Sequence, residues 1–250
     1  DYKPINEEES WGKKWESAWF HLEGRVPEEW AGQTVAANLD FSGEGLVYDN
    51  KGKVIIEENT LVLCVENFLN KTKLKKPIIT NLSTTAALDE IAKKYNCQVI
   101  RSAVGEINVV NEMKKHNAHI GGEGNGGVIL AESHLGRDAF VGAVIILNLL
   151  ASNKLTMHEA NQKIPKYYML KEKVEINPQI NNQVISNRIK QAFNECKFDE
   201  TDGIKVLDKY SWLHVRQSNT EPIIRVYIES KQEEKLSEIF DKVKTIFNDN

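Results

Sequence analysis

The sequence predicts a three-layer α/β domain built on a mixed sheet, followed by a small α+β domain, with a short β-rich segment at the N-terminus. Three observations support this fold class. From about residue 46 to 164, strand patterns alternate with amphipathic helix patterns, as in α/β domains. After residue 166, strand patterns follow one another directly, which favours antiparallel pairing. Four of the five tryptophans fall within the first 45 residues, which sets that segment apart.

The N-terminal segment, residues 1–45, reads as two strands separated by a turn around Pro27 in "AWFHLEGRVPEEWAGQTVAANLDF". Tryptophans can bind sugars by stacking, but in a short β segment they are more often core residues, and we favour the core interpretation. The four tryptophans of this segment are Trp11, Trp15, Trp19 and Trp30.

The middle domain, residues 46–165, shows the βαβ rhythm of a parallel sheet with one further strand pair. Pro165 is expected to end it. The expected strands are 76–83, 97–103, 118–122 and 127–131, and the expected helices are 84–96, 104–117 and one that starts near Arg137.

The apolar run "FVGAVIILNLLA", residues 140–151, is too short to span a bilayer, and we predict a buried helix. The net charge of −4 comes from interspersed acidic and basic residues, so we expect neither a nucleic-acid nor a membrane partner. The three cysteines lack metal-ligand or disulfide spacing, which favours reduced thiols and a cytoplasmic location.

The last domain, residues 166–250, starts with a linker and an opening strand in "KYYMLKEKVEINPQINNQ". Its pattern indicates a small α+β structure with antiparallel strands. The further elements expected are a helix at 184–195, strands at 203–209, 211–217 and 223–229, and a helix from Gln232 to Phe247.

The segment "HVRQSNTEPIIRVYIE", residues 214–229, gathers hydrogen-bond donors around one Glu-Pro turn. Strand alternation turns Arg216 and Arg225 away from the core face. Two guanidinium groups, hydroxyls and successive backbone N–H groups suit a tetrahedral dianion such as a phosphate ester. From spacing alone, an ordinary hairpin turn with solvated arginines is equally consistent.

The glycine-rich stretch "GGEGNGG", residues 121–127, joins two expected strands and carries only two side chains with hydrogen-bonding atoms, Glu123 and Asn125. A carboxylate beside an amide suits vicinal sugar hydroxyls, and glycines allow close approach of a ligand. Taken alone, the pattern favours a plain turn.

The segment "RQSNTEPIIRVYIE" strongly resembles the C-terminal phosphate-binding loop of the α-D-phosphohexomutase family, which includes phosphoglucomutase, phosphomannomutase and phosphoglucosamine mutase. The resemblance implies a loop that holds the substrate phosphate that is not transferred. The residues it assigns to this phosphate are Arg216, Ser218, Asn219, Thr220 and Arg225.

The glycine loop is similar to the sugar-binding loop of the family's third domain, which implies that Glu123 and Asn125 contact the hexose. Asn125 stands where many members have serine, and Gly127 stands where many have histidine. Segments "AVGEINVVNEM" and "HLGRDAF" also resemble the third domain. They suggest rim candidates, for each of which a structural or solvated role is the competing interpretation: Arg101, His134 and Arg137.

The resemblance starts at about Leu46, so it implies only the back half of a mutase. The family uses a phosphoserine, a magnesium ion held by three aspartates and a bisphosphorylated sugar activator. The corresponding stretch here offers Asp40 and Glu44, so we assign this chain no catalytic residue, no metal ligand and no cofactor of its own. We therefore expect it to bind a hexose phosphate but to be inactive without a chain or segment that supplies the missing domains.

The upstream stretch, to about residue 50, resembles an N-terminal β region of family 38 α-mannosidases, outside their catalytic domain. A chimeric chain is the simplest explanation of two resemblances in one sequence. Two other functions stay open: a non-enzymatic phosphosugar-binding or interaction module, and a fragment of an α-mannosidase-type carbohydrate-active protein. The N-terminal stretch has no paired-carboxylate glycosidase site, which argues against the last.

Overall fold

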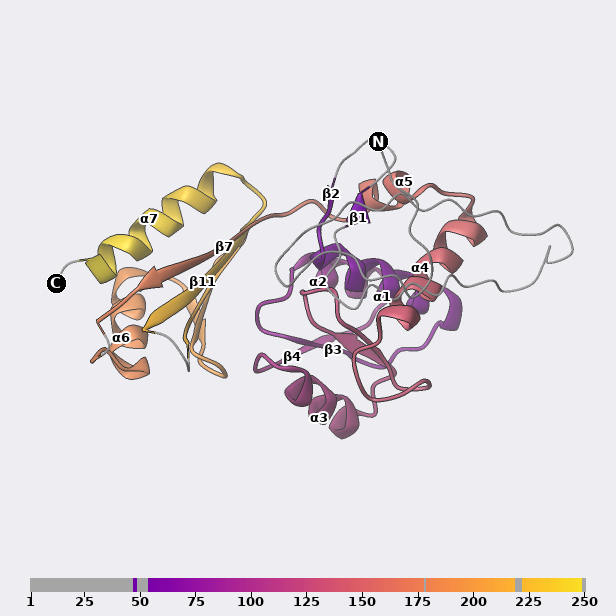
Figure 1. The fold of residues 1–250 in the computed structure, drawn as a ribbon, viewed down its shortest axis with the longest axis horizontal. Helices are drawn as coiled ribbons and strands as arrows, with labels where there is room; N and C mark the ends of the chain where they lie inside the picture. Colours follow the sequence, from indigo (N-terminus) through magenta and orange to yellow (C-terminus); the bar gives the residue numbers. More distant parts are fainter. Residues whose placement is uncertain (1–46, 49–53, 178, 219–221, 249–250) are drawn as a thin grey trace, which may run out of the picture. The chain divides into compact units, whose positions relative to one another are not determined.

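The computed structural model describes residues 47–48, 54–177, 179–218 and 222–248. Within these residues, two domains follow one another along the chain, and each is built around its own sheet (Figure 1). The fold class predicted from the sequence is confirmed for both of them. The β-rich segment predicted for residues 1–45 lies outside the described residues.

The first domain alternates helices and strands as predicted. Its elements are β1 (Val47–Tyr48), β2 (Val54–Ile55), α1 (Glu58–Thr72), β3 (Ile78–Asn81), α2 (Ala87–Lys94), β4 (Val99–Ser102), α3 (Glu106–His116), β5 (Ile120–Gly122), β6 (Val128–Leu130), α4 (Ala139–Asn153) and α5 (Met157–Gln162). The main sheet has the strand order β4-β3-β5-β6. Strand β3 runs parallel to β4 and β5, whereas β6 runs antiparallel to β5, so the sheet is mixed.

Both faces of this sheet are covered, which gives three layers. Ile78 and Ile79 are adjacent on β3 and fully buried, but they enter different cores because successive side chains of a strand point to opposite faces. Ile78 packs with α1 and α2, and Ile79 packs with Val109 and Met113 of α3. Figure 1 shows α3 on one side of β3 and β4, and α1 and α2 on the other.

The prediction of a buried helix at 140–151 is right about the helix and wrong about its burial. Helix α4 is apolar on all sides, yet only Gly142 and Leu149 are buried, while Phe140 and Leu147 are each 44% exposed. Helix α4 packs on α1, which covers one stripe of its surface. The uniformly apolar sequence of α4 therefore did not predict how much of the helix surface is buried in the described structure.

The second domain is an antiparallel sheet with helices, as predicted. Its elements are β7 (Tyr168–Glu175), α6 (Asn182–Ala192), β8 (Lys197–Asp199), β9 (Ile204–Leu207), β10 (Ser211–Gln217), β11 (Ile223–Ser230) and α7 (Glu234–Asn248). The strand order is β7-β11-β10-β9-β8, and every pairing is antiparallel.

One face of this sheet forms the core of the second domain. Val215, Val226 and Ile228 are fully buried there and pack with residues of α6 and α7. The residues between them along each strand point to the opposite face, which carries polar and charged side chains. This polar face holds both predicted phosphate-binding arginines.

Several elements differ from the sequence-based prediction. Helix α1 and strands β1, β2 and β8 were not among the elements expected from the sequence. The single helix expected after Arg137 is two helices, because Thr156 forms a capping box with Glu159 and starts α5 afresh.

Candidate functional site

The two arginines of the donor-rich turn lie directly opposite each other. Strands β10 and β11 pair so that Arg216 faces Arg225, and their chain neighbours Val215 and Val226 are fully buried on the other face. Directly opposite residues of an antiparallel pair share a face. Two guanidinium groups are thus held side by side, which is unfavourable unless an anion joins them.

Asp202 is the acidic neighbour of Arg216. Its carboxylate Oδ2 lies 3.4 Å from Arg216 Nε, which is an ion-pair distance. Nε is nevertheless buried and makes no hydrogen bond in the described structure. Gly203, with a φ of +64°, permits this approach, because a Cβ there would lie 2.4 Å from the carbonyl oxygen of Val215. Sequence reasoning missed Asp202 and Gly203, although a glycine after an acidic residue is a turn signal.

The turn between β10 and β11 is only partly described. The Ser218 backbone N–H donates to the Ile223 carbonyl at 2.9 Å, which closes the hairpin next to the arginines. Ser218 therefore directly follows β10. Asn219 and Thr220, the other two predicted phosphate contacts, lie outside the described residues.

Glu123 in the glycine loop is buried and held by the first domain's own groups. Its Oε1 accepts hydrogen bonds from Asn81 Nδ2 at 2.8 Å and from the Gly105 backbone N–H at 2.9 Å. Its Oε2 lies 3.7 Å from Arg137 Nη1. One carboxylate oxygen thus fixes the side chain, and the other is directed to a cation at the loop. Asn125 is exposed, and its Oδ1 accepts from the Gly127 N–H at 3.2 Å.

Arg137 lies over the glycine loop, whereas His134 contacts Asp138. Arg137 donates through its backbone N–H and Nε to Glu106 at 3.1 and 2.8 Å. A Cβ at Gly127 would lie 2.3 Å from Arg137 Cδ, so the absence of a side chain at 127 makes room for the Arg137 stem. His134 Nε2 lies 3.0 Å from Asp138 Oδ2 and is half exposed.

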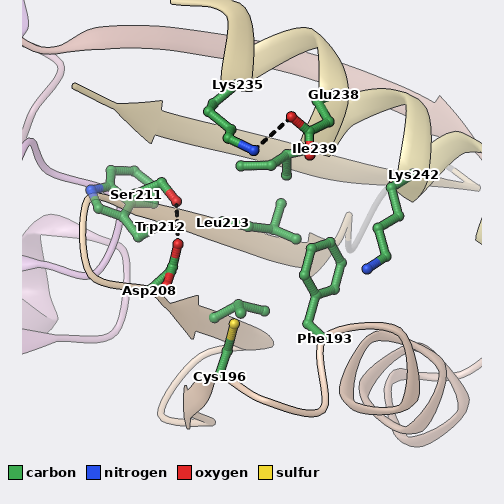
Figure 2. Close-up of a pocket in the computed structure, with 11 residues that line it drawn as sticks. Phe193, Cys196, Asp208, Ser211, Trp212, Leu213, Lys235, Glu238, Ile239 and Lys242 are labelled. Carbon is green, nitrogen blue, oxygen red and sulfur yellow. Dashed lines mark hydrogen bonds and ion pairs between the residues drawn. The ribbon is translucent and has the colours of Figure 1, made fainter. Parts of the chain in front are cut away.

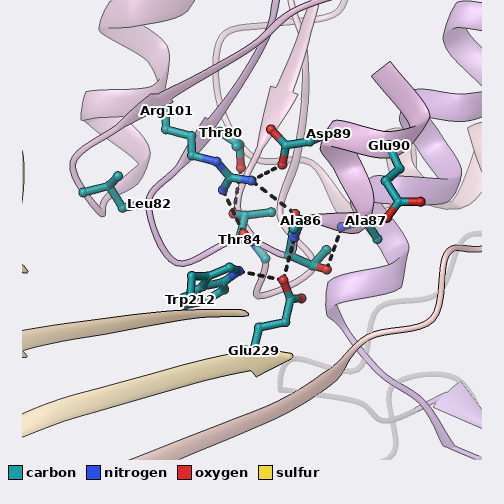
Figure 3. A network of polar contacts seen from close by, with 12 residues as sticks. Thr80, Leu82, Thr84, Ala86, Ala87, Asp89, Glu90, Arg101, Trp212 and Glu229 are labelled. Carbon is teal, nitrogen blue, oxygen red and sulfur yellow. Dashed lines mark hydrogen bonds and ion pairs between the residues drawn. The ribbon is translucent and has the colours of Figure 1, made fainter. Parts of the chain in front are cut away.

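Arg101 has a structural role in this arrangement. Its Nη1 donates to the carbonyls of Asn81 at 3.1 Å and Thr84 at 2.8 Å, and it forms an ion pair with Asp89 (Figure 3). These contacts fix the loop between β3 and α2. Glu229 Oε2 accepts from the Ala86 N–H in the same network.

A two-residue turn links the two predicted binding sites. The Val104 N–H donates to Asp202 Oδ2 at 3.0 Å, and Asp202 is the ion-pair partner of Arg216. The next N–H, of Gly105, donates to Glu123 Oε1. The arginine pair and the glycine loop are therefore connected through two consecutive backbone amides. Sequence reasoning did not predict this link because it depends on contacts about 100 residues apart.

The polar face of the second sheet also contains buried polar groups that the sequence did not reveal. His214 is 1% exposed, because its Nδ1 meets Ser83 Oγ at 2.8 Å and its Nε2 meets the Asp202 carbonyl at 2.6 Å. Burial lowers the pKa of His214 to about 4, so the ring is neutral at pH 7. Lys205 donates to the Leu82 carbonyl, and burial lowers the pKa of its ammonium well below the usual value.

The cavities lie apart from the arginine pair. A cavity of about 180 Å³ in the second domain is lined by Phe193, Cys196, Leu213 and side chains of α7 (Figure 2). A second, of about 330 Å³, has Arg101 and Lys205 in its wall. In the part of the chain that is described, no His, Cys, Asp or Glu cluster could hold a metal, and no helix is long and apolar enough to cross a membrane.

Comparison with known proteins agrees with this architecture. Residues 57–168 match the phosphoglucomutase/phosphomannomutase alpha/beta/alpha domain III, and residues 169–246 match the C-terminal domain of the same proteins. The chain belongs to the phosphoglucomutase/phosphomannomutase family. The boundary between the matches falls at the start of β7.

Mutases from several organisms are related to this chain. A phosphoglucomutase/phosphomannomutase from Thermococcus kodakarensis is 33% identical over 195 residues, which cover 77% of this chain and 42% of the relative. A phosphoglucosamine/phosphogalactosamine mutase from Sulfurisphaera tokodaii is 32% identical over 223 residues, which cover 86% of this chain and 49% of the relative. The chain thus spans less than half the length of the relatives it matches.

Solved structures show the same fold at lower identity. A phosphoglucomutase/phosphomannomutase family protein from Burkholderia thailandensis superposes with a TM-score of 0.68 at 19% identity, over 80% of this chain and 43% of that one. A putative phosphomannomutase from Thermus thermophilus gives a TM-score of 0.63 at 19% identity, with the same coverage.

The N-terminal resemblance is also found. Residues 1–60 match an alpha-mannosidase jelly roll domain. This match overlaps that of domain III at residues 57–60, in the first turn of α1. Models of two different families therefore match different parts of one chain, as the sequence predicted.

Proposed function

We propose that residues 46–250 are the hexose-phosphate-binding half of a phosphohexomutase. The observation that carries the proposal is the link from Arg216 through Asp202 and the amides of Val104 and Gly105 to Glu123. A cationic pair suited to a phosphate is thereby connected to a carboxylate suited to sugar hydroxyls. The family membership of the chain supports the same function.

The arginine pair would bind the phosphate that stays on the substrate. Arg216 and Arg225 project from one sheet face, so both forks can approach the same tetrahedral dianion. The Arg216 side chain keeps 25% of its exposure, so its guanidinium group can approach a phosphate oxygen. Ser218 lies at the end of the same strand, and Asn219 and Thr220 follow it in the sequence.

The glycine loop would read the sugar. Glu123 Oε1 is occupied by two donors, so Oε2 is the oxygen that can accept from a hexose hydroxyl. Arg137 beside it can donate to the same hydroxyl or to a ring substituent. Which hexose fits depends on these contacts. Glucosamine, mannose and glucose phosphates are the candidate substrates.

A calorimetric titration of glucosamine 6-phosphate tests this function. Removing one charged partner of a phosphate costs about 1.5 to 3 kcal/mol, so Arg216→Ala should weaken binding roughly 10- to 150-fold. Lys190→Ala serves as the control, because Lys190 is paired with Glu200 on the surface. Equal affinity of wild type and Arg216→Ala would exclude the arginine pair from the site.

We also propose that these 250 residues bind substrate without converting it. Phosphoryl transfer needs a phosphoryl donor and a cation that neutralises charge during transfer. The sequence has no run of three aspartates spaced one residue apart, and Asp40 and Glu44 lie outside the described residues. A coupled mutase assay with magnesium and a bisphosphate primer should show no turnover. Stoichiometric phosphoserine after incubation with the primer, detected by mass spectrometry, would contradict this proposal.

A further inference from the structure

A third cation lies in the same cross-strand row as the two arginines. Arg225 of β11 pairs with Arg216 of β10 on one side and with Lys173 of β7 on the other. Strands β7 and β11 run side by side in the second domain (Figure 1). The sequence alone places Lys173 in an opening strand, 43 residues before Arg216 and 52 before Arg225, and gives no reason to group it with them.

The three side chains share the polar face of the sheet. Directly opposite residues project to the same side, and the residues next to them in the chain enter the core on the other side. Val174, the neighbour of Lys173, is 7% exposed and belongs to the core that contains Val215 and Val226. The three cations therefore form a continuous row across three strands.

Of the three cations in this row, only Arg216 has an ion-pair partner among the described residues, although the exposed Glu175, two positions after Lys173 on β7, shares their face. Asp202 approaches Arg216, but neither Arg225 nor Lys173 forms an ion pair with a described residue. Lys171, two positions earlier on β7, is different, because Glu57 and Glu58 bind its Nζ at 2.8 and 3.0 Å. Like charges directly opposite each other destabilise a sheet. The row is thus an arrangement that a bound anion would stabilise.

The distances across the row suit one phosphate group. Neighbouring strands lie about 4.8 Å apart, so Arg216 and Lys173 are separated by roughly 10 Å at the backbone, with Arg225 between them. Long side chains from both flanks can converge on an anion held over Arg225. A lysine contributes there as a compact point charge, and an arginine as a planar fork.

We infer that Lys173 is a third cationic residue of the phosphate subsite, contributed by β7 to bind the phosphomonoester of the hexose. The inference rests on the proposed function and adds a residue that the phosphate-binding turn does not contain. The competing explanation is that Lys173 merely protects an edge strand from pairing with another chain, since β7 is the outer strand of the sheet.

The test compares Lys173→Gln with Lys197→Gln by titration of glucosamine 6-phosphate and inorganic phosphate at low salt. Lys197 is the matched control, because it is also exposed but lies on β8, the opposite edge strand. Lys173→Gln should weaken the binding of both ligands roughly three- to tenfold. About 0.5 M NaCl should reduce this difference in affinity between the variant and wild type. Lys173→Arg should retain wild-type binding, and Lys197→Gln should change nothing.

A thermal melt separates a binding role from a structural one. Without ligand, the melting temperature of Lys173→Gln should be higher than that of wild type, because repulsion between the cations is relieved. Added phosphate should raise the melting temperature of Lys173→Gln by less than it raises that of wild type. Unchanged affinity, or a ligand-free melting temperature below wild type, would overturn the inference. If wild type itself bound neither ligand, the proposed function would fail instead, independently of Lys173.

Discussion

At the scale of single residues, His214 shows how context changes an exposed position into a buried one. Strand alternation puts it on the same face as Arg216, yet Arg216 keeps 25% of its side-chain exposure and His214 keeps almost none. Ser83 and the Asp202 carbonyl enclose the ring and satisfy both its nitrogens. A carbonyl can only accept, so Nε2 carries the proton and Nδ1 accepts from the serine hydroxyl.

The buried ring predicts a loss of stability in acid. The pKa of His214 is lowered from 6.5 to about 4, so its contribution is complete above pH 6.5 and is lost as the pH falls toward 4. The total is on the order of 3 kcal/mol. Denaturant unfolding at pH 7 and pH 4.5 should show wild type losing roughly 2 to 3 kcal/mol more than His214→Gln. Glu58, whose pKa burial raises to about 7, is common to both proteins and cancels. An equal loss of unfolding free energy in both proteins would refute the assignment of a buried, neutral His214.

At the scale of elements, helix α4 separates hydrophobicity from burial. Leu147 and Leu149 are chemically identical and two residues apart, but their exposures are 44% and 7%. Leu149→Ala should therefore cost about 2 to 4 kcal/mol of unfolding free energy and Leu147→Ala less than about 1. Urea denaturation of the two variants provides the measurement. Similar losses would mean that α4 is covered on both sides, as the sequence had suggested.

The periodicity of the sequence predicted secondary-structure elements better than it predicted contacts between residues. The alternation in β10 and β11 was enough to direct Arg216 and Arg225 to one face, and strand-helix rhythm was enough for the three-layer domain. Asp202 and Lys173 could not be found in this way, because they reach the arginines through tertiary packing and strand pairing. A residue's cross-strand neighbour is fixed by register, which a single sequence does not specify.

At the scale of the whole molecule, the described structure connects two mutase domains through buried polar contacts. Glu229 of the second domain binds the N–H of Ala86 at the start of α2, and burial raises the pKa of this carboxyl. A negative group at a helix N-terminus interacts favourably with the helix dipole. The sequence suggested a hinge from Pro165 to Lys173, but residues 168–173 belong to β7 and pair with β11, so only residues 163–167 link the two domains. We propose that this short linker is the hinge on which a ligand would close them.

The mannosidase-like segment precedes the two mutase domains in the chain. Residues 1–60 match a jelly roll domain, while 57–246 match a mutase. We propose that phosphosugar binding belongs to the mutase part alone. The relatives are about twice as long as the stretch they share with this chain. We therefore also propose that a partner supplies the other mutase domains.

We expect one hexose phosphate to engage both the arginine pair and the glycine loop. Competition titrations of glucosamine 6-phosphate and inorganic phosphate, on wild type and Glu123→Gln, test it most directly. The glutamine keeps an oxygen for Asn81 and Gly105, so the loop is retained while the carboxylate is lost. Wild type should prefer the sugar phosphate, and Glu123→Gln should lose most of that preference while binding inorganic phosphate as before. Equal affinity of wild type for both ligands, or a preference that ignores Glu123, would contradict the claim.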